Sequence, residues 1–371
     1  MTTRREFLGA TGGALAGIAF VGCDLLAAAP ARAQAPRVQA ARRHVVVNGK
    51  RAKVVDVHAH CAVPEALALM NLKLGGPARR PDLDMVTEVA ARLRAMDEQG
   101  IDVEALSINP YWYKADRDLA RQIVKIQNEK LAEACAANPE RFVAFATVAL
   151  QHPDLAAEQL EDGVKKYGLR GAAIGGSVNA DEISDPKFHP FWAKAEQLGV
   201  VVFIHPQGTG APADLQHRFK GNGYLDNVIG NPLETTIALS HLIFEGTLDR
   251  FPGLKICAAH GGGFLPSYAG RWDFGCLTRP DRCAGGTYGP IKKKPSEYLK
   301  QLYFDTMVFT PEGLRHLAAE AGAGQLMVGT DYPYPWTKTA VDQVLSTPGL
   351  SDDQKVAILE GTAAKLLGIK S

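Results

Sequence analysis

Eight short apolar runs alternate with amphipathic segments along most of this 371-residue chain, and this alternation restricts the fold more than any other feature. The apolar runs cover residues 54–57, 103–108, 142–150, 171–174, 200–204, 255–259, 302–306 and 325–329. Segments with helical periodicity lie between them, at residues 86–99, 119–137, 155–167, 191–198, 233–248 and 313–321. Strand-then-helix units repeated with one composition predict an α/β fold with parallel strands, here a (β/α)8 TIM barrel.

A doubly wound open sheet is the structural alternative, because it uses the same strands and helices in a different order. That fold usually carries a glycine-rich phosphate loop after its first strand. In this chain the first apolar run leads instead into His58-Ala59-His60. The barrel is therefore the preferred prediction.

The composition suits one large core and gives no sign of a charged macromolecular partner. Hydrophobic residues make up 46% of the chain, and the formal net charge is only +1. A strongly basic chain would be expected of a nucleic-acid-binding protein. We therefore expect a globular enzyme that acts on a small molecule and binds no nucleic acid.

The first residues have the pattern of an export signal. Arg4-Arg5 precedes an apolar, glycine- and alanine-rich segment that runs to about residue 29, and Ala31-Arg32-Ala33 offers a cleavage site. This predicts a twin-arginine signal peptide at 1–33, a linker and N-terminal extension at 34–53, and the barrel domain at 54–371. The mature protein would then be periplasmic, with membrane contact only through the signal.

Two other uses of this segment compete with export through cleavage. A permanent membrane anchor is one, but the apolar segment is short and rich in glycine for a membrane span. A lipoprotein attached through Cys23 is the other, although Phe20 fits poorly ahead of such a site. In an oxidising periplasm Cys276 and Cys283 could close a small loop, a pairing that sequence alone leaves open.

Five polar side chains stand where apolar runs end. His58 and His60 close the first run, His205 the fifth, His260 the sixth and Asp331 the eighth. The carboxyl ends of all strands in a parallel barrel meet on one face, and imidazoles and carboxylates bind divalent metals. One such histidine alone would more often be only a hydrogen-bonded polar group. All five together predict a metal site at the mouth of the barrel.

Insertions at 61–83, 207–230 and 276–296 interrupt the alternation and are expected over the C-terminal face of the barrel. A helix start is predicted after the second insertion, with Asn231 as its cap, Pro232 at the first helical position and Glu234 in the first turn. Glu234 is thereby interpreted as a helix-start residue. Tyr332, Tyr334 and Trp336 follow the eighth run and are expected either at the rim of the pocket or in packing contacts.

Five segments lie at or near the predicted site, at residues 56–60, 96–103, 231–235, 260–263 and 329–333. They resemble the amidohydrolase superfamily, in the amidohydrolase 2 branch that contains aminocarboxymuconate-semialdehyde decarboxylase and related non-oxidative aromatic-acid decarboxylases. The resemblance implies a barrel of metal-dependent hydrolase type. The resemblance implies that His58, His60, His205 and Asp331 bind one divalent ion, Zn²⁺ by preference and Mn²⁺ as the alternative. His260 would act as the acid/base. Binuclear members bridge two metals through a lysine on the fourth strand, and residues 171–175 contain none.

Two arginines correspond to residues that grip substrate carboxylates in this branch, one of them from a neighbouring subunit. They are Arg80, in the first insertion, and Arg271, eleven residues after His260. A guanidinium binds a carboxylate through two parallel hydrogen bonds, so the pair suits an acidic substrate. Surface or interface salt bridges are the alternative role. The resemblance also implies a homodimer.

Three functions remain open on these residues. The first is a metal-dependent carboxy-lyase acting on an aromatic or unsaturated carboxylic acid. The second is an exported hydrolase of a lactone, ester or amide, because the same ligands and His260 serve both reactions. The third is a periplasmic binding protein without chemistry, which the intact set of site residues disfavours. Gln207 stands where the decarboxylase carries a bulky aromatic residue, so the shape of the pocket is open.

Overall fold

The computed structural model describes residues 42–72, 89–207, 217–284 and 289–370. The predicted signal peptide at 1–33 and Arg80 lie outside the described residues. Within these ranges no helix combines the length and the apolar character that a membrane crossing requires.

Eight parallel strands form a closed ring, so the predicted (β/α)8 barrel is confirmed and the open sheet is wrong. The strands are β3 (Val55–His60), β4 (Val103–Ser107), β5 (Phe142–Ala144), β6 (Gly171–Gly175), β9 (Val201–His205), β10 (Lys255–Ala258), β11 (Leu302–Asp305) and β12 (Leu326–Met327). They pair in the orders β3-β4-β5 and β6-β9-β10-β11-β12. Bridges between Ala146 and Ala172 and between Asp56 and Val328 join the two sheets at both seams.

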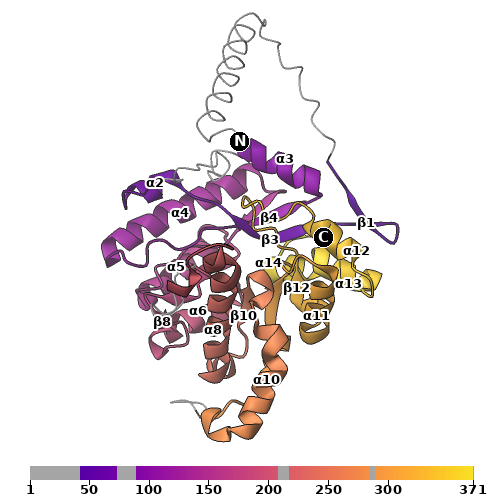
Figure 1. Ribbon diagram of the computed structural model, residues 1–371. Helices are drawn as coiled ribbons and strands as arrows, with labels where there is room; N and C mark the ends of the chain where they lie inside the picture. Colours follow the sequence, from indigo (N-terminus) through magenta and orange to yellow (C-terminus); the bar gives the residue numbers. More distant parts are fainter. Residues whose placement is uncertain (1–41, 73–88, 208–216, 285–288, 371) are drawn as a thin grey trace, which may run out of the picture. The chain divides into compact units, whose positions relative to one another are not determined.

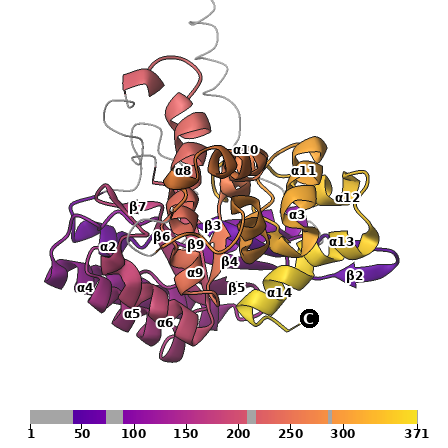
Figure 2. The ribbon, with the colours of Figure 1, turned by 90° about the horizontal axis from the view of Figure 1, so that it is seen from below.

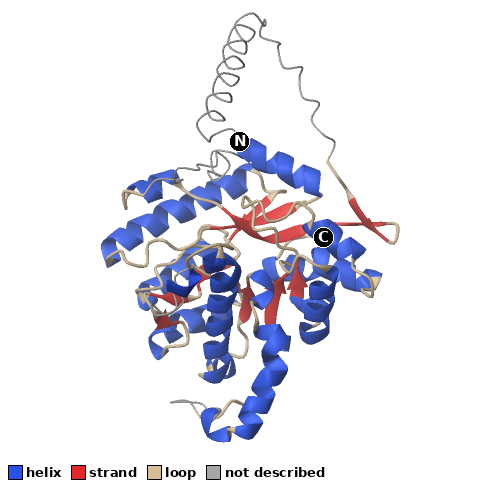
Figure 3. Cartoon of the chain, viewed as in Figure 1, coloured by secondary structure: helices blue, strands red, loops and turns tan. Residues whose placement is uncertain are grey.

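Helices surround the strands, as the blue and red segments of Figure 3 show. They are α2 (Pro64–Ala68), α3 (Val89–Gln99), α4 (Arg117–Ala137), α5 (Pro153–Lys165), α6 (His189–Leu198), α8 (Asn231–Phe244), α9 (Thr247–Arg250), α10 (Leu265–Thr278), α11 (Pro311–Ala321), α12 (Ala340–Ser346), α13 (Asp352–Val356) and α14 (Thr362–Leu367). In Figure 2, α4, α5 and α6 lie side by side along one flank of the barrel.

Short elements complete the fold. Antiparallel hairpins are formed by β1 (Val45–Val47) with β2 (Lys50–Ala52) and by β7 (Ser177–Val178) with β8 (Asp181–Glu182). The first hairpin lies within the segment expected as linker and N-terminal extension. Short helical turns are η2 (Pro186–Phe188), η3 (His217–Phe219), η4 (Asp226–Gly230), η5 (His260–Gly262), η6 (Pro280–Arg282), η8 (Pro295–Gln301), η9 (Ala323–Gln325) and η10 (Ala357–Gly361).

The apolar core has two parts because side chains alternate across each strand. On β9, Val202 and Ile204 join the cluster between the strands and the helices, whereas Val201 and Phe203 join the cluster inside the barrel. Side chains of α14, Leu367 among them, complete the inner cluster. In Figure 1 this yellow helix lies beside the purple strand β3, which it contacts. The packed interior leaves the opposite, carboxyl ends of the strands to form a site.

A β-bulge in β3 changes the direction of its last side chains. Between Asp56 and Ala59, β3 has one more residue than the facing stretch of β4. Val57 faces the barrel interior, so simple alternation would send Ala59 there next. A bulge re-aims the side chains that follow it. Here His58 and His60 turn toward each other at the barrel mouth, with their Nε2 atoms 3.0 Å apart.

The predicted cap at Asn231 is wrong, although α8 does begin at that residue. Asn231 has helical dihedral angles, and the wide turn η4 runs directly into α8. A capping residue needs a non-helical backbone, so Asn231 cannot cap this helix. Pro232 does occupy the first turn, as predicted.

Candidate metal centre

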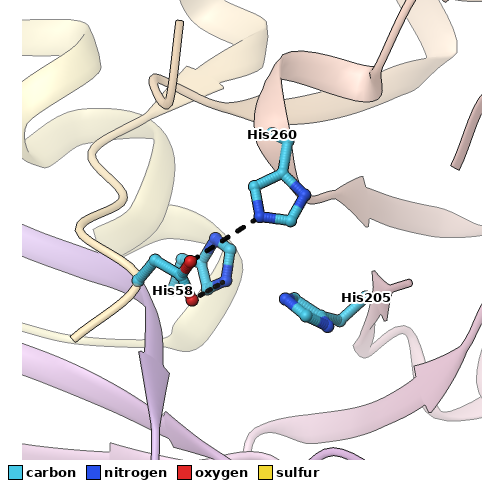
Figure 4. Close-up of side chains that lie close together, drawn as sticks. His58, His205 and His260 are labelled. Atoms are coloured by element: carbon cyan, nitrogen blue, oxygen red, sulfur yellow. Dashed lines mark ion pairs between the residues drawn. The ribbon is translucent and has the colours of Figure 1, made fainter. Parts of the chain in front are cut away.

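The predicted residues meet at the carboxyl ends of four strands. One ligand atom from each of His58, His205, His260 and Asp331 lies within 4.8 Å of the others. Figure 4 shows the three histidine rings around one common space. His60 joins them, because its Nε2 lies 2.7 Å from Asp331 Oδ1, while His58 Nε2 lies 3.2 Å from the same oxygen. The structure thus gathers all five residues, although they span some 270 positions of the chain.

The chemistry of this cluster fits a divalent cation. Both ring nitrogens of His205 are buried and make no hydrogen bond within the described part of the chain, and the same holds for His260 Nδ1. Buried polar atoms without partners are rare and need an explanation. In addition, two imidazole Nε2 atoms and a carboxylate oxygen converge at His58, His60 and Asp331. Imidazole and carboxylate ligands suit zinc or manganese.

Neighbouring side chains hold the outer nitrogens of two of these histidines. Asp305, at the end of β11, approaches His58 Nδ1 to 2.6 Å, and Ser107 Oγ lies 3.2 Å from His60 Nδ1. Such contacts fix the ring orientation, so that Nε2 points at the metal position. Asp305 also accepts hydrogen bonds from the backbone N–H groups of His260 and Gly261, at 2.9 and 2.8 Å. One carboxylate therefore positions a predicted ligand and the predicted acid/base together.

Sequence reasoning missed Asp305, although the signal that found the others applies to it. It lies one residue before the end of the seventh apolar run, whereas His205 and His260 directly follow the fifth and sixth. Glu234 was interpreted too narrowly as a helix-start residue. It is 2% exposed and accepts a hydrogen bond of 2.9 Å from the backbone N–H of Gln207, which fixes the chain just after His205.

Two of the site residues have unusual backbone conformations. His260 has φ of 55° and Asp331 has φ of 59°, a left-handed region that residues other than glycine rarely adopt. Such conformations persist where the surrounding structure imposes them, and they concentrate at functional sites. After His260 the chain continues with Gly261, Gly262 and Gly263, all with positive φ. A Cβ at Gly263 would lie 2.2 Å from the carbonyl oxygen of Pro232, so only glycine fits this approach to α8.

The electrostatics divide the histidines into two kinds. Burial lowers the pKa of His60, and burial together with the neighbouring histidines lowers the pKa of His205 well below its ordinary value. Burial acts in the same direction on His58, but Asp331 and Asp305 outweigh it and raise its pKa to about 10. At neutral pH His60 and His205 would therefore offer unprotonated nitrogens to a metal ion, whereas His58 would have to release a proton in order to bind it.

A buried ion pair supports β3 from the side. Arg92 of α3 donates hydrogen bonds to Glu104 of β4 and to the backbone carbonyl of His60. Its guanidinium carbon also lies 4.5 Å from the ring centre of Tyr332, the residue after Asp331. Tyr332 thus packs against Arg92. Tyr334 and Trp336, in contrast, line the cavity beside the site, as expected.

A small cavity of about 180 Å³ has His60 in its wall. Two larger cavities that adjoin each other also open on the cluster, and we call them the first and second chambers. The first chamber, of about 750 Å³, has His205 and Asp331 in its wall. The second, of about 530 Å³, has His260 in its wall. The wall of the first chamber also includes Asn109, Tyr111, Gln207, Tyr224, Asp226, Asn227, Asn231, Tyr334 and Trp336. The wall of the second also includes Asn227, Val228, Asn231, Pro232, Gly263, Phe264, Met307, Phe309 and Trp336.

Arg271 lies outside both chambers. It is an exposed residue of α10, and neither chamber of the described structure includes it. Farther along the same helix, Cys276 forms a disulfide with Cys283, so the pairing that the sequence left open is made. The structure of one chain therefore does not bring Arg271 to the metal centre.

A closed barrel with a histidine and aspartate cluster at the carboxyl ends of its strands defines a metal-dependent barrel enzyme. The chain belongs to the Amidohydrolase family, because residues 55–369 match the sequence profile of that family. It is 32% identical over 284 residues to the 2-amino-3-carboxymuconate-6-semialdehyde decarboxylase of Dictyostelium discoideum, a match that covers 75% of this chain and 76% of the relative.

Solved structures agree with this placement. The 5-carboxyvanillate decarboxylase from Sphingomonas paucimobilis superposes with a TM-score of 0.76 and 28% identity, covering 86% of this chain and 99% of the other. A dihydroxybenzoic acid decarboxylase from Polaromonas sp. JS666, with bound manganese and the inhibitor 2-nitroresorcinol, gives a TM-score of 0.73 and 28% identity, covering 86% and 97%. The predicted branch and the metal-dependent carboxy-lyase function are confirmed, and the hydrolase alternative is not favoured.

Replacing Asp305 by Asn will weaken metal binding and change its dependence on pH. If His58 binds the ion as predicted, one proton leaves it on binding, so we expect the association constant for Mn²⁺ to rise about tenfold per pH unit between about pH 6 and pH 9. Asp305→Asn removes a charge that raises the pKa of His58 and a contact that orients its ring. We expect roughly 10- to 100-fold weaker binding near pH 8 and a shallower slope.

Titration calorimetry with Mn²⁺ at several pH values will measure both quantities. Asp273→Asn is the matched control, because Asp273 also accepts hydrogen bonds, from the backbone N–H and the hydroxyl of Ser296, but lies on α10. Equal affinities and slopes in the two variants would refute the role assigned to Asp305.

Proposed function

We propose that this enzyme removes carbon dioxide from an aromatic or unsaturated carboxylic acid, with one divalent ion and with His260 as the acid/base. The observation that carries the proposal is the convergence of His58, His205, His260 and Asp331 at the mouth of a barrel whose relatives are decarboxylases. The first chamber supplies space for the substrate beside this cluster. Amide and phenol groups in its wall suit the hydroxyl and carboxylate groups of such an acid.

His58, His60, His205 and Asp331 are the proposed ligands of a single ion. Their support is the approach of the Nε2 atoms of His58 and His60 to Asp331 Oδ1. In addition, both ring nitrogens of His205 lack a hydrogen-bond partner among the described residues. The ion supplies Lewis-acid polarisation of a substrate oxygen. We propose Zn²⁺, with Mn²⁺ as the alternative because the dihydroxybenzoic acid decarboxylase was solved with manganese.

His260 is the proposed proton donor and acceptor. Its Nε2 lies 3.8 Å from Asp331 Oδ2, its side chain is 15% exposed, and it faces the second chamber. From this position the imidazolium gives its proton to the ring carbon that bears the carboxylate. The bond from that carbon to the carboxylate then breaks, carbon dioxide leaves, and the electron pair of the broken bond restores the aromatic ring. Nε2 regains a proton from solvent.

Replacing His260 by Asn will separate proton transfer from metal binding. A positioned general acid typically contributes about 10²- to 10⁴-fold to the rate, so we expect kcat for carbon dioxide release from 2,6-dihydroxybenzoate or 5-carboxyvanillate to fall by that factor. The metal content should stay near that of the wild type. His205→Ala should lose the metal as well as the activity.

The matched control is His316→Asn, which makes the same chemical change at an exposed residue of α11. Loss of metal in His260→Asn would show that His260 is a ligand rather than the acid/base. Turnover of lactones or esters without release of carbon dioxide from any acid would overturn the decarboxylase proposal.

We also propose a homodimer in which Arg271 completes the site of the neighbouring subunit, with Arg80 as the second carboxylate contact. Arg271 is exposed on α10, next to exposed Tyr268, Phe274 and Leu277. Exposed apolar side chains of this size often mark an interface.

A mixture of the inactive variants Arg271→Ala and His260→Asn should regain about a quarter of the wild-type activity. The reason is that half of the dimers contain one subunit of each variant, and each of these dimers has one complete site. No recovery would refute the shared site.

Export by the twin-arginine route is a further proposal, supported by Arg4-Arg5, the apolar segment and Ala31-Arg32-Ala33. Changing both Arg4 and Arg5 to Lys should keep the protein out of the periplasmic fraction. Arg37→Lys, beyond the proposed cleavage site, is the control and should be exported normally. Equal export of both variants would refute the route, and attachment to the membrane through Cys23 would instead support a lipoprotein.

A further inference from the structure

The two chambers reach the metal centre from different sides. His205 and Asp331 face the first chamber, whereas His260 faces the second. Three residues, Asn227, Asn231 and Trp336, line both chambers, so the cavities adjoin. If the proposed function holds, the reacting carbon lies between the metal ligands and His260. A substrate in that position extends into both chambers.

The chambers differ in chemistry. The wall of the first offers the amides of Asn109 and Gln207, besides the shared residues. It also offers the hydroxyls of three tyrosines and the carboxylate of exposed Asp226. The wall of the second, apart from His260 and the two shared asparagines, consists of apolar side chains and glycine: Val228, Pro232, Gly263, Phe264, Met307, Phe309 and Trp336. An apolar group gains free energy on leaving water for such a place, whereas a hydroxyl or carboxylate loses hydrogen bonds there.

An aromatic ridge separates the chambers at their mouths. The rings of Tyr224 and Trp336 are stacked, with centres 6.2 Å apart and planes 12° apart, and the ring of Phe309 lies 6.1 Å from that of Trp336. Tyr224, Trp336 and Phe309 are 59%, 37% and 51% exposed. Large apolar side chains gathered on a surface in this way mark a place where a ligand or partner covers them.

We propose that the preferred substrate is an aromatic acid whose ring carries an apolar substituent, an alkyl chain or a second ring, and that this substituent occupies the second chamber. The inference rests on the proposed function for the position of the carboxylate. The polar ring substituents face the first chamber, and the ridge covers the flat face of the apolar group. The structure thereby assigns Val228, Met307 and Phe309 as residues that select the substrate.

A substrate series tests the proposal on the metal-loaded, full-length enzyme. We would compare 2,6-dihydroxybenzoate with its methyl, propyl and pentyl derivatives, substituted at ring position 3 or 4. We expect kcat/KM to rise roughly threefold per added CH₂ and to be at least tenfold higher for the pentyl than for the unsubstituted acid in one of the two series. A flat or falling trend in both series would overturn the proposal.

Neighbouring residues of η4 provide a matched pair of variants. Val228 lines the second chamber, whereas Ile229 lines neither chamber and is equally exposed, at 41% against 42%. Val228→Trp should lower the ratio of kcat/KM for the pentyl and unsubstituted acids at least tenfold, and Ile229→Trp should leave it within twofold. Val228→Phe replaces Val228→Trp if the larger residue prevents folding. Equal effects at the two positions would overturn the proposal.

Two further readouts keep this test apart from that of the proposed function. If no acid releases carbon dioxide, the proposed function fails. Binding of the acids to the second chamber is then measured through the fluorescence of Trp336. Trp336→Phe is the control, because it shows the signal of the other three tryptophans. Tighter binding of the pentyl acid by at least tenfold, abolished by Val228→Trp, supports the chamber, and equal binding overturns it. A loss of dimer in Val228→Trp without any effect of alkyl length shows that a second copy covers this face, which also overturns it.

Discussion

The seam between the first and last strands of the barrel is the contact on which the metal centre depends. The backbone N–H of Asp331 donates to the carbonyl of His58 at 2.8 Å, and the N–H of His60 donates to the carbonyl of Tyr332 at 2.6 Å. Three of the five site residues therefore stand on the two sides of one seam. Buried Asp56 adds two hydrogen bonds across this seam, because its carboxylate accepts from both the hydroxyl and the backbone N–H of Thr330. The backbone contacts that close the ring therefore also place three of the site residues.

Much of this architecture could be read from local patterns. A short apolar run in the sequence predicted each strand. The polar residues that follow those runs could also be identified in the sequence. His205 and His260 needed only the rule that parallel strands end on one face. Asp305 follows the same rule, but it is one of 40 acidic residues in the chain. No neighbouring residue in the sequence marks it as the partner of His58. Its contact with His58 spans 247 positions of the chain.

Other features depend on tertiary context that no short pattern records. Asn231 followed by Pro232 indicates a helix start, yet the wide turn η4 continues the helical backbone in front of it and removes the need for a cap. Arg92 and Glu104 are buried charges whose pairing becomes evident only when α3 lies against the seam. The two chambers likewise combine residues from several loops, so their contrast in polarity could not be foreseen from any one of them.

The bulge in β3 has a consequence for how this barrel can change. The side chains before the bulge alternate between the two parts of the core. The bulge interrupts this alternation, so that His58 and His60 both point to the barrel mouth. Val55 and Val57 can therefore drift among residues of similar size without moving His58 and His60. Loss of the single extra residue would instead turn both histidines away from the mouth at once. The first residues of β3 should therefore tolerate substitution better than the strand tolerates a change in length.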